Sequence, residues 1–233
     1  MDKKNKICLV VTITCTILVM GLCIFAIVNH KTENCNDAQK IKKDYERYNN
    51  AIIEGTKNRL VKVQIVENNP FYIKTPKEII KVLKKEKALI FFGDAKNSLS
   101  RIAIEVLIEV AQENNIDKIY YVDIFGIADE YKFDGTIEPK RIKEGALAYD
   151  KIRDFLKDNL SRYYVEDKNG NLYDTGVTRL YAPTLIAVEN NKVLGFHEKT
   201  VNTHENEFKK LTKEEKEELK TYYQMIIDKI IGA

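Results

Sequence analysis

Residues 88–107 read ALIFFGDAKNSLSRIAIEVL, and this stretch decides the fold. Ala88 to Phe92 is an apolar, aromatic-rich run that predicts a fully buried strand. Gly93 to Lys96 predicts a tight connection, and apolar residues at helical spacing predict a helix from Ser98 onward. The polar residues expected on its solvent face are Arg101, Glu105, Glu109 and Gln112. The stretch therefore predicts a strand that leads through a short loop into an amphipathic helix packed on a sheet.

The flanking segments supply the rest of a sheet. Ile116 to Ile124 predicts a second buried strand, parallel to the first and joined to it by a right-handed crossover. Upstream, the alternation in LVKVQIV, residues 60–66, predicts a half-buried first strand. Thr75, Pro76 and Glu78 predict a helix start with a capping box and a proline in the first position.

The second half of the chain predicts further elements. Residues 125–139 indicate a loop or insertion, and apolar spacing over residues 142–160 predicts a helix. Asn169-Gly170 is a strong hairpin-turn signal. A strand is expected at Leu185 to Val188, followed by a turn and a second strand. A capping box at Thr212 and Glu215 starts a terminal helix with an apolar stripe.

An apolar run from Ile7 to Val28 predicts a membrane anchor, because about 1.5 Å per residue spans roughly a 30 Å hydrocarbon core. Lysines before it place the N-terminus in the cytoplasm. The alternatives are a cleaved signal peptide and a lipoprotein signal at Cys23, but no small-x-small site follows Val28 and Leu22 precedes Cys23. The expected parts are a cytoplasmic N-terminus (1–6), a transmembrane signal anchor in membrane lipid (7–28), a juxtamembrane stalk (29–58) and an extracytoplasmic domain (59–233).

Charge and cysteine placement exclude several functions. The formal net charge is +3, too balanced to indicate a nucleic-acid partner. The four cysteines, Cys8, Cys15, Cys23 and Cys35, all lie in or just after the anchor. The globular part therefore has no internal disulfide, thiolate metal site or thiol nucleophile. Cys35 is either an unpaired thiol or the intermolecular disulfide of a homodimer.

The strand, loop and helix of residues 88–107 resemble the active-site segment of thioredoxin-like proteins. More narrowly they resemble the membrane-anchored Gram-positive group that includes bacteriocin transport accessory proteins, in which a Gly-x-x-x-Cys-Pro-x-Cys-Arg pattern is expected. With Gly93 and Arg101 aligned to that pattern, the cysteine positions fall on Asn97 and Ser100. Disulfide exchange needs an attacking thiolate and a resolving thiol, so this loop is expected to be degenerate and redox-inactive.

The resemblance also implies a fold and a site. The fold is an α/β thioredoxin-like domain with a central mixed sheet flanked by helices, here with an N-terminal transmembrane helix. Pro183 matches the family's cis-proline, and Phe91 stands where a buried acid is common. The degenerate loop comprises Asn97, Ser98, Leu99, Ser100 and Arg101, with Asn97 or Ser98 as the helix cap. The binding groove comprises Gly93, Ala182, Pro183 and Thr184.

Other chemistry has little support in the sequence. A serine nucleophile at Ser98 or Ser100 lacks a Gly-x-Ser-x-Gly elbow. His197, Glu198 and His204 form a poor metal pattern, for which exposed loop histidines are the simpler interpretation. Asp123 and Asp129, expected at the end of the sheet, show no paired-carboxylate spacing that indicates catalysis. No catalytic residue, metal or cofactor is expected.

Three functions are compatible with the sequence, of which the first is favoured. It is a redox-inactive binding or chaperone-like accessory module for an exported protein or peptide. The second is a thiol-disulfide oxidoreductase that acts through Cys35 of the same or a neighbouring chain. The third is a structural subunit of an envelope complex. The expected partner is thus an unknown exported polypeptide or envelope protein.

Overall fold

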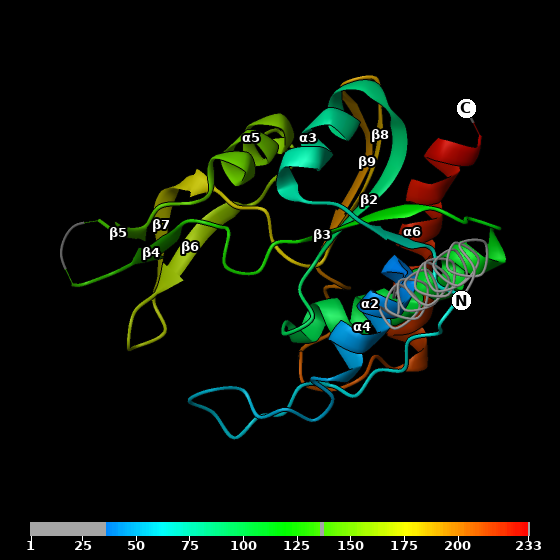
Figure 1. The fold of residues 1–233 in the computed structure, drawn as a ribbon. Helices are drawn as coiled ribbons and strands as arrows, with labels where there is room; N and C mark the ends of the chain where they lie inside the picture. Colours follow the sequence, from blue (N-terminus) through cyan, green and yellow to red (C-terminus); the bar gives the residue numbers. More distant parts are fainter. Residues whose placement is uncertain (1–35, 136–137, 233) are drawn as a thin grey trace, which may run out of the picture. The chain divides into compact units, whose positions relative to one another are not determined.

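The computed structural model describes residues 36–135 and 138–232 (Figure 1). The chain divides into two compact units, residues 1–36 and 37–233, and the described helices and strands lie in the second. The expected anchor at Ile7 to Val28 and the thiol of Cys35 lie outside the described residues. Within the described part, no helix is long and apolar enough to cross a membrane.

A five-stranded mixed sheet forms the centre of this unit. The strands, in spatial order, are β1 (Phe71–Ile73), β3 (Ile119–Asp123), β2 (Lys87–Gly93), β8 (Thr184–Glu189) and β9 (Lys192–Glu198). The first three strands are parallel, whereas β8 and β9 are antiparallel to their neighbours. This mixed α/β arrangement is compatible with the expected thioredoxin-like fold.

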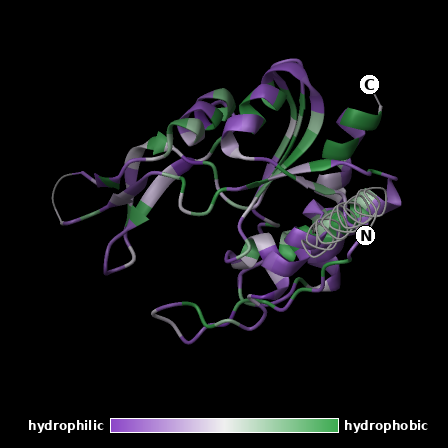
Figure 2. Cartoon of the chain, in the orientation of Figure 1, coloured by the Kyte–Doolittle hydropathy of each residue, from purple (hydrophilic) through white to green (hydrophobic). Residues whose placement is uncertain are grey.

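Helices cover both faces of the sheet and build two cores. One core contains side chains of α2 (Asp37–Glu46), α4 (Ser98–Glu113) and α6 (Lys213–Ile231). The other contains side chains of α3 (Pro76–Lys85) and α5 (Leu147–Leu156). Along β2, Leu89 and Phe91 enter the first core, and Ile90 and Phe92 enter the second. Strand β2 is therefore buried on both faces, as its sequence predicts, and Figure 2 shows hydrophobic stretches along the central strands.

Three expected helix starts are confirmed. Thr75 and Glu78 form the capping box of α3, and Thr212 and Glu215 form that of α6. Asn97 caps α4, since its side-chain oxygen accepts a hydrogen bond from the Ser100 N–H at 2.8 Å. These caps satisfy N–H groups that the first helical turn leaves without partners.

Two hairpins are inserted around α5. The first joins β4 (Glu130–Lys132) to β5 (Lys140–Lys143), and the second joins β6 (Arg162–Glu166) to β7 (Leu172–Thr178) across the expected Asn-Gly turn. The expected helix over 142–160 was wrong at its start. Ile142 lies in β5 with 62% of its surface exposed, because the hairpin continues to Lys143 before the chain turns into α5.

The folded unit begins earlier than the expected boundary at residue 59. Helix α2 lies within the segment expected to be a stalk, yet Ile41 and Tyr45 are 1% and 0% exposed in the first core. Two apolar residues four positions apart suffice to dock one face of a short helix. Residues 37–58 therefore belong to the domain.

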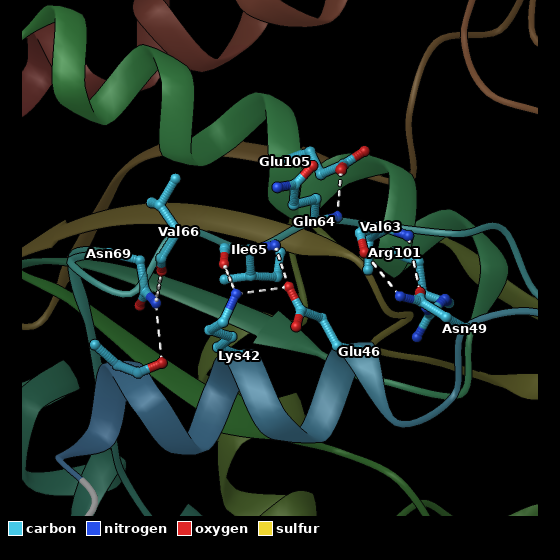
Figure 3. A network of polar contacts seen from close by, with 11 residues as sticks. Lys42, Glu46, Asn49, Val63, Gln64, Ile65, Val66, Asn69, Arg101 and Glu105 are labelled. Carbon is cyan, nitrogen blue, oxygen red and sulfur yellow. Dashed lines mark hydrogen bonds and ion pairs between the residues drawn. The ribbon is translucent and has the colours of Figure 1, made fainter.

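Residues 60–66 are not a sheet strand. The expected alternation is present, because Val61, Val63 and Ile65 are buried while Lys62, Gln64 and Val66 are exposed. The segment runs between α2 and α4, however, and side chains from α2, the turn after it and α4 bond its main chain (Figure 3).

Candidate functional site

A cleft of about 510 Å³ opens where the parallel strands β2 and β3 end. The loop after β2 contributes Asp94 and Asn97, and the segment before β8 contributes residues 179–182. The remaining lining residues are Ile124, Phe125, Gly126, Ala128, Glu130 and Lys143. Crevices at the carboxyl ends of parallel strands are frequent ligand sites.

Sheet pairing brings together the two segments on which the thioredoxin-like resemblance rests, the loop after Gly93 and the segment around Pro183. Phe92 of β2 pairs with Thr184 of β8, so the residues just before Thr184 run beside the loop that follows Gly93. The Ala182–Pro183 peptide bond is cis, as the resemblance implied. Asn97 and Ala182 line the same cleft.

Most of the expected site residues are nevertheless buried. Ser98 is 3% exposed and Ser100 is 0% exposed, while Asn97 and Leu99 are half-buried. Of the four expected groove residues, Gly93, Pro183 and Thr184 are buried, and only Ala182 lines the cleft.

Gly93 serves packing rather than binding. A Cβ atom at this position would lie 2.7 Å from Cε2 of Tyr121 and 2.9 Å from both Cε1 of Phe91 and the Tyr45 hydroxyl oxygen. Real Cβ atoms do not approach neighbours so closely. Because Gly93 has no Cβ atom, the rings of Tyr121 and Phe91 and the Tyr45 hydroxyl of α2 can pack against the end of β2.

Arg101 was expected on the solvent face of α4 and is instead fully buried. Its guanidinium donates to the carbonyls of Val61, Tyr45 and Ala95 at 2.7–2.8 Å, and to the Asn49 side-chain oxygen at 2.5 Å. Helix α2 and residues 60–66 cover this face of α4, which is why a helix with an amphipathic sequence is buried on almost every side.

Two carboxylates lie at the strand ends, of which Asp123 was noted from the sequence, with no catalytic pairing, and Asp94 was not. Asp94 follows β2 directly, and Asp123 ends the neighbouring strand β3. A second cleft of about 240 Å³ lies beside both carboxylates and shares Asp94 and Phe125 with the larger cleft. Burial raises the pKa of each carboxyl group above its usual value. An acid at the end of each of two adjacent buried strands was the signal that the sequence offered.

The main chain beside the cleft has unused hydrogen-bonding groups. Among the described residues, nothing bonds the N–H or the carbonyl of Ala182, although the Tyr181 carbonyl accepts from the Thr184 hydroxyl at 2.7 Å. The Arg179 guanidinium lies 4.2 Å from the ring centroid of Tyr163 and 5.8 Å from that of Tyr181. Open main-chain groups next to aromatic walls suit an extended polypeptide.

The two histidines of the described residues, His197 and His204, make separate local contacts. Nε2 of His197 lies 2.9 Å from the Thr200 carbonyl, and Nδ1 of His204 lies 3.2 Å from Glu215. Across residues 36–135 and 138–232, no group of three His, Cys, Asp or Glu side chains is placed to hold a metal ion.

Comparisons with protein-family models, curated proteins and solved structures yield no match for this chain. The fold and the site thus define it only as a mixed α/β domain with a cleft at the carboxyl end of its parallel strands.

Proposed function

We propose that this chain is a membrane-anchored, redox-inactive thioredoxin-like module that holds an extended segment of an exported polypeptide. The segment would lie in the cleft between Asp94–Asn97 and Arg179–Ala182. In this proposal the anchor at Ile7 to Val28 keeps the domain on the outer face of the cell membrane. The module acts as a binding or chaperone-like accessory and carries out no thiol chemistry.

One observation supports the proposal: a mixed α/β sheet compatible with a redox-type scaffold carries no cysteine at the two positions expected for its thiols. The sheet order, the cis bond before Pro183 and the helix start at Asn97 are compatible with a thioredoxin-like fold and support the proposal. Asn97, at the position expected for the attacking thiol, is half-buried, whereas Ser100, at the position of the resolving thiol, is fully buried. The first position is therefore the more accessible one. All four cysteines of the chain precede residue 36.

The cleft supports a polypeptide ligand. An extended chain beside Ala182 would pair with the free N–H and carbonyl there, as an added strand pairs with a sheet edge. Its side chains would contact Phe125, which is 56% exposed, and the ring of Tyr181. Main-chain pairing accepts many sequences, which suits an accessory protein for an exported polypeptide.

Binding of a permanently unfolded polypeptide tests the proposal. The full chain in lipid nanodiscs is titrated into fluorescein-labelled, reduced and carboxymethylated lactalbumin, and anisotropy is recorded. Ala182→Trp should fill the cleft and weaken binding by about tenfold, a loss of about 1.4 kcal/mol. Leu172→Trp, at a side chain that is 67% exposed on the second hairpin, is the matched control. Equal affinity of the two variants contradicts the proposed site.

A further inference from the structure

Helix α3 carries a face of lysines. Residues 72–87 contain six lysines and two glutamates, although the whole chain has a net charge of only +3. At 100° per residue, the lysines within α3 share the side opposite the buried residues Ile79, Val82 and Leu83. This lysine face consists of Lys77, Lys81, Lys84 and Lys85, all of which are exposed.

The α3 lysines differ from those of α6 in their ion pairing. Lys216 contacts Glu109 and Lys220 contacts Glu113, each at 2.6 Å, so α6 directs its charge toward α4. In the described part of the chain, none of the four α3 lysines forms a salt bridge. The nearby acids are engaged locally, because Glu78 caps α3 at Thr75 and Glu86 accepts from the Tyr120 hydroxyl. Among the described residues, Glu78 attracts Lys81 without forming a salt bridge with it, and the lysine face therefore keeps most of its positive charge unpaired.

The edge of the sheet beside α3 extends this surface. Tyr72 of β1 is 49% exposed, and Nζ of Lys118 lies 6.0 Å from its ring centroid and 4.5 Å from that of Tyr120. Nζ of Lys74 lies 5.7 Å from the Tyr120 ring. A half-exposed tyrosine surrounded by lysines has the composition found where proteins meet lipid headgroups.

The domain starts at this same edge. The Asp37 carboxylate accepts a hydrogen bond from the Ile73 N–H at 3.1 Å, so α2 begins beside β1. Only residues 29–36 separate Asp37 from the apolar run that ends at Val28. Eight residues reach at most about 28 Å when fully extended. That reach exceeds the width of a helix with its side chains, about 10–12 Å, so the tether permits α3 to touch the bilayer.

We propose that the lysine face of α3, with Tyr72 at its edge, docks on anionic lipid headgroups of the membrane that anchors the chain. This inference rests on the membrane location in the proposed function. Each lysine near an anionic surface is worth about a fivefold preference, and four together make the docked state dominant. The attraction weakens at high salt, since the Debye length falls from about 8 Å at 0.15 M to about 3 Å at 1 M. Docking would fix the orientation of the domain above the bilayer.

A tryptophan reporter tests the docking. The chain has no tryptophan, so Tyr72→Trp in the full chain gives a single signal. The protein is reconstituted into vesicles that carry a spin-labelled quencher lipid, made of phosphatidylcholine alone or with phosphatidylglycerol. Quenching is expected to be at least about twofold stronger with phosphatidylglycerol, and 1 M salt should remove the difference. A tryptophan reporter placed instead at Leu172 (Leu172→Trp) should show no difference in quenching between the two kinds of vesicle.

Two variants, each with four lysines replaced in the Tyr72→Trp background, distinguish an effect of the lysine face from an effect of the net charge of the protein. Replacing Lys77, Lys81, Lys84 and Lys85 by Gln should lower quenching to the phosphatidylcholine level. The control replaces four exposed lysines elsewhere, Lys157, Lys168, Lys192 and Lys209, and should leave quenching unchanged. Circular dichroism confirms folding of both. Equal quenching in the two lipids, or no quenching in either, overturns the inference.

Flotation of the same samples distinguishes this inference from the proposed function. A chain that floats with both kinds of vesicle but shows no lipid preference overturns only the docking. A chain that floats with neither vesicle overturns the membrane location and the docking together.

Discussion

At the scale of single residues, Arg101 is the largest fully buried side chain of the described domain. It is fully buried, and its hydrogen-bond acceptors are three main-chain carbonyls and an amide, with no carboxylate among them. Burial lowers the pKa of its guanidinium. The four hydrogen bonds of the planar group nevertheless join α2, the turn after it, residues 60–66 and the loop after β2, which explains an arginine in place of an apolar residue.

Arg101→Met is expected to destabilise the domain by about 3 kcal/mol, because three buried carbonyls lose their donor at about 1 kcal/mol each. Urea unfolding of the full chain in detergent, followed by circular dichroism, measures the change. Arg47→Met is the control, since Arg47 is 60% exposed in its pair with Asp44. A change below about 0.5 kcal/mol for Arg101→Met would contradict this description of the residue.

Asp123 should make stability depend on pH with a defined sign. Since burial raises its pKa above the usual 3.8, the folded chain holds this proton to a higher pH than the unfolded chain does. The stability from this group is therefore present at low pH and lost as pH rises through the folded pKa. Asp123→Asn keeps an oxygen for the Phe125 N–H. It should be more stable than the parent at pH 7, with the difference closing below pH 3.8.

Asp167 supplies a control of opposite sign. Hydrogen bonds, first from the Asn171 side chain, lower its pKa to about 2. Asp167→Asn should therefore be less stable than the parent at pH 7, and the difference should shrink as pH falls toward 2. Thermal unfolding across this pH range checks both variants. If both variants were more stable than the parent at pH 7, or both less stable, the opposite pKa shifts of Asp123 and Asp167 would be refuted.

At the scale of elements, residues 60–66 show how side chains can replace a partner strand. Asn49 donates to the Val63 carbonyl and accepts from the Val63 N–H, both at 2.9 Å. Glu46 accepts from the Ile65 N–H, and Lys42 donates to the Ile65 carbonyl (Figure 3). From the opposite side, Glu105 of α4 accepts from the Gln64 N–H at 2.8 Å. The extended backbone is thus satisfied without joining the sheet.

Asn49→Ala should loosen this segment by about 2–3 kcal/mol, because both main-chain groups of Val63 and one donor of Arg101 lose their partner. Hydrogen exchange at Val63 and Ile65 should accelerate correspondingly. Asn68→Ala, at an exposed asparagine just after the segment, is the matched control. Unchanged protection of Val63 would show that the Asn49 side chain is dispensable.

The same elements show what the sequence could predict. Strands β2 and β3, the capped helices and the Asn-Gly hairpin each follow from a local pattern of apolar spacing or turn chemistry, and the structure confirms them. Alternation correctly predicted which side chains of residues 61–66 are buried, although Leu60 is buried as well. It could not predict that the main-chain partners are side chains from α2, the turn after it and α4, because those contacts join distant segments.

At the scale of the whole molecule, long-range packing decided what sequence reasoning missed. Helix α2 has a thin apolar edge, so its place in the core depends on β1 and α4 rather than on its own pattern. Arg101 is polar and was therefore expected to be exposed. For the site, the cis bond at Pro183 followed from the resemblance, but the burial of Ser98 and Pro183 depends on how the sheet brings the two segments together.

The central claim of the proposed function is that the domain is a redox-type scaffold without its two thiols, and restoring them tests it most directly. Asn97→Cys with Ser100→Cys, in a chain carrying Cys35→Ser, should catalyse the reduction of insulin by dithiothreitol. The Cys35→Ser parent and the single Ser100→Cys variant should be inactive, since exchange needs both thiols. Turbidity of the precipitating insulin chains reports the rate. A folded double variant that stays inactive, or a parent that is already active, would contradict the account.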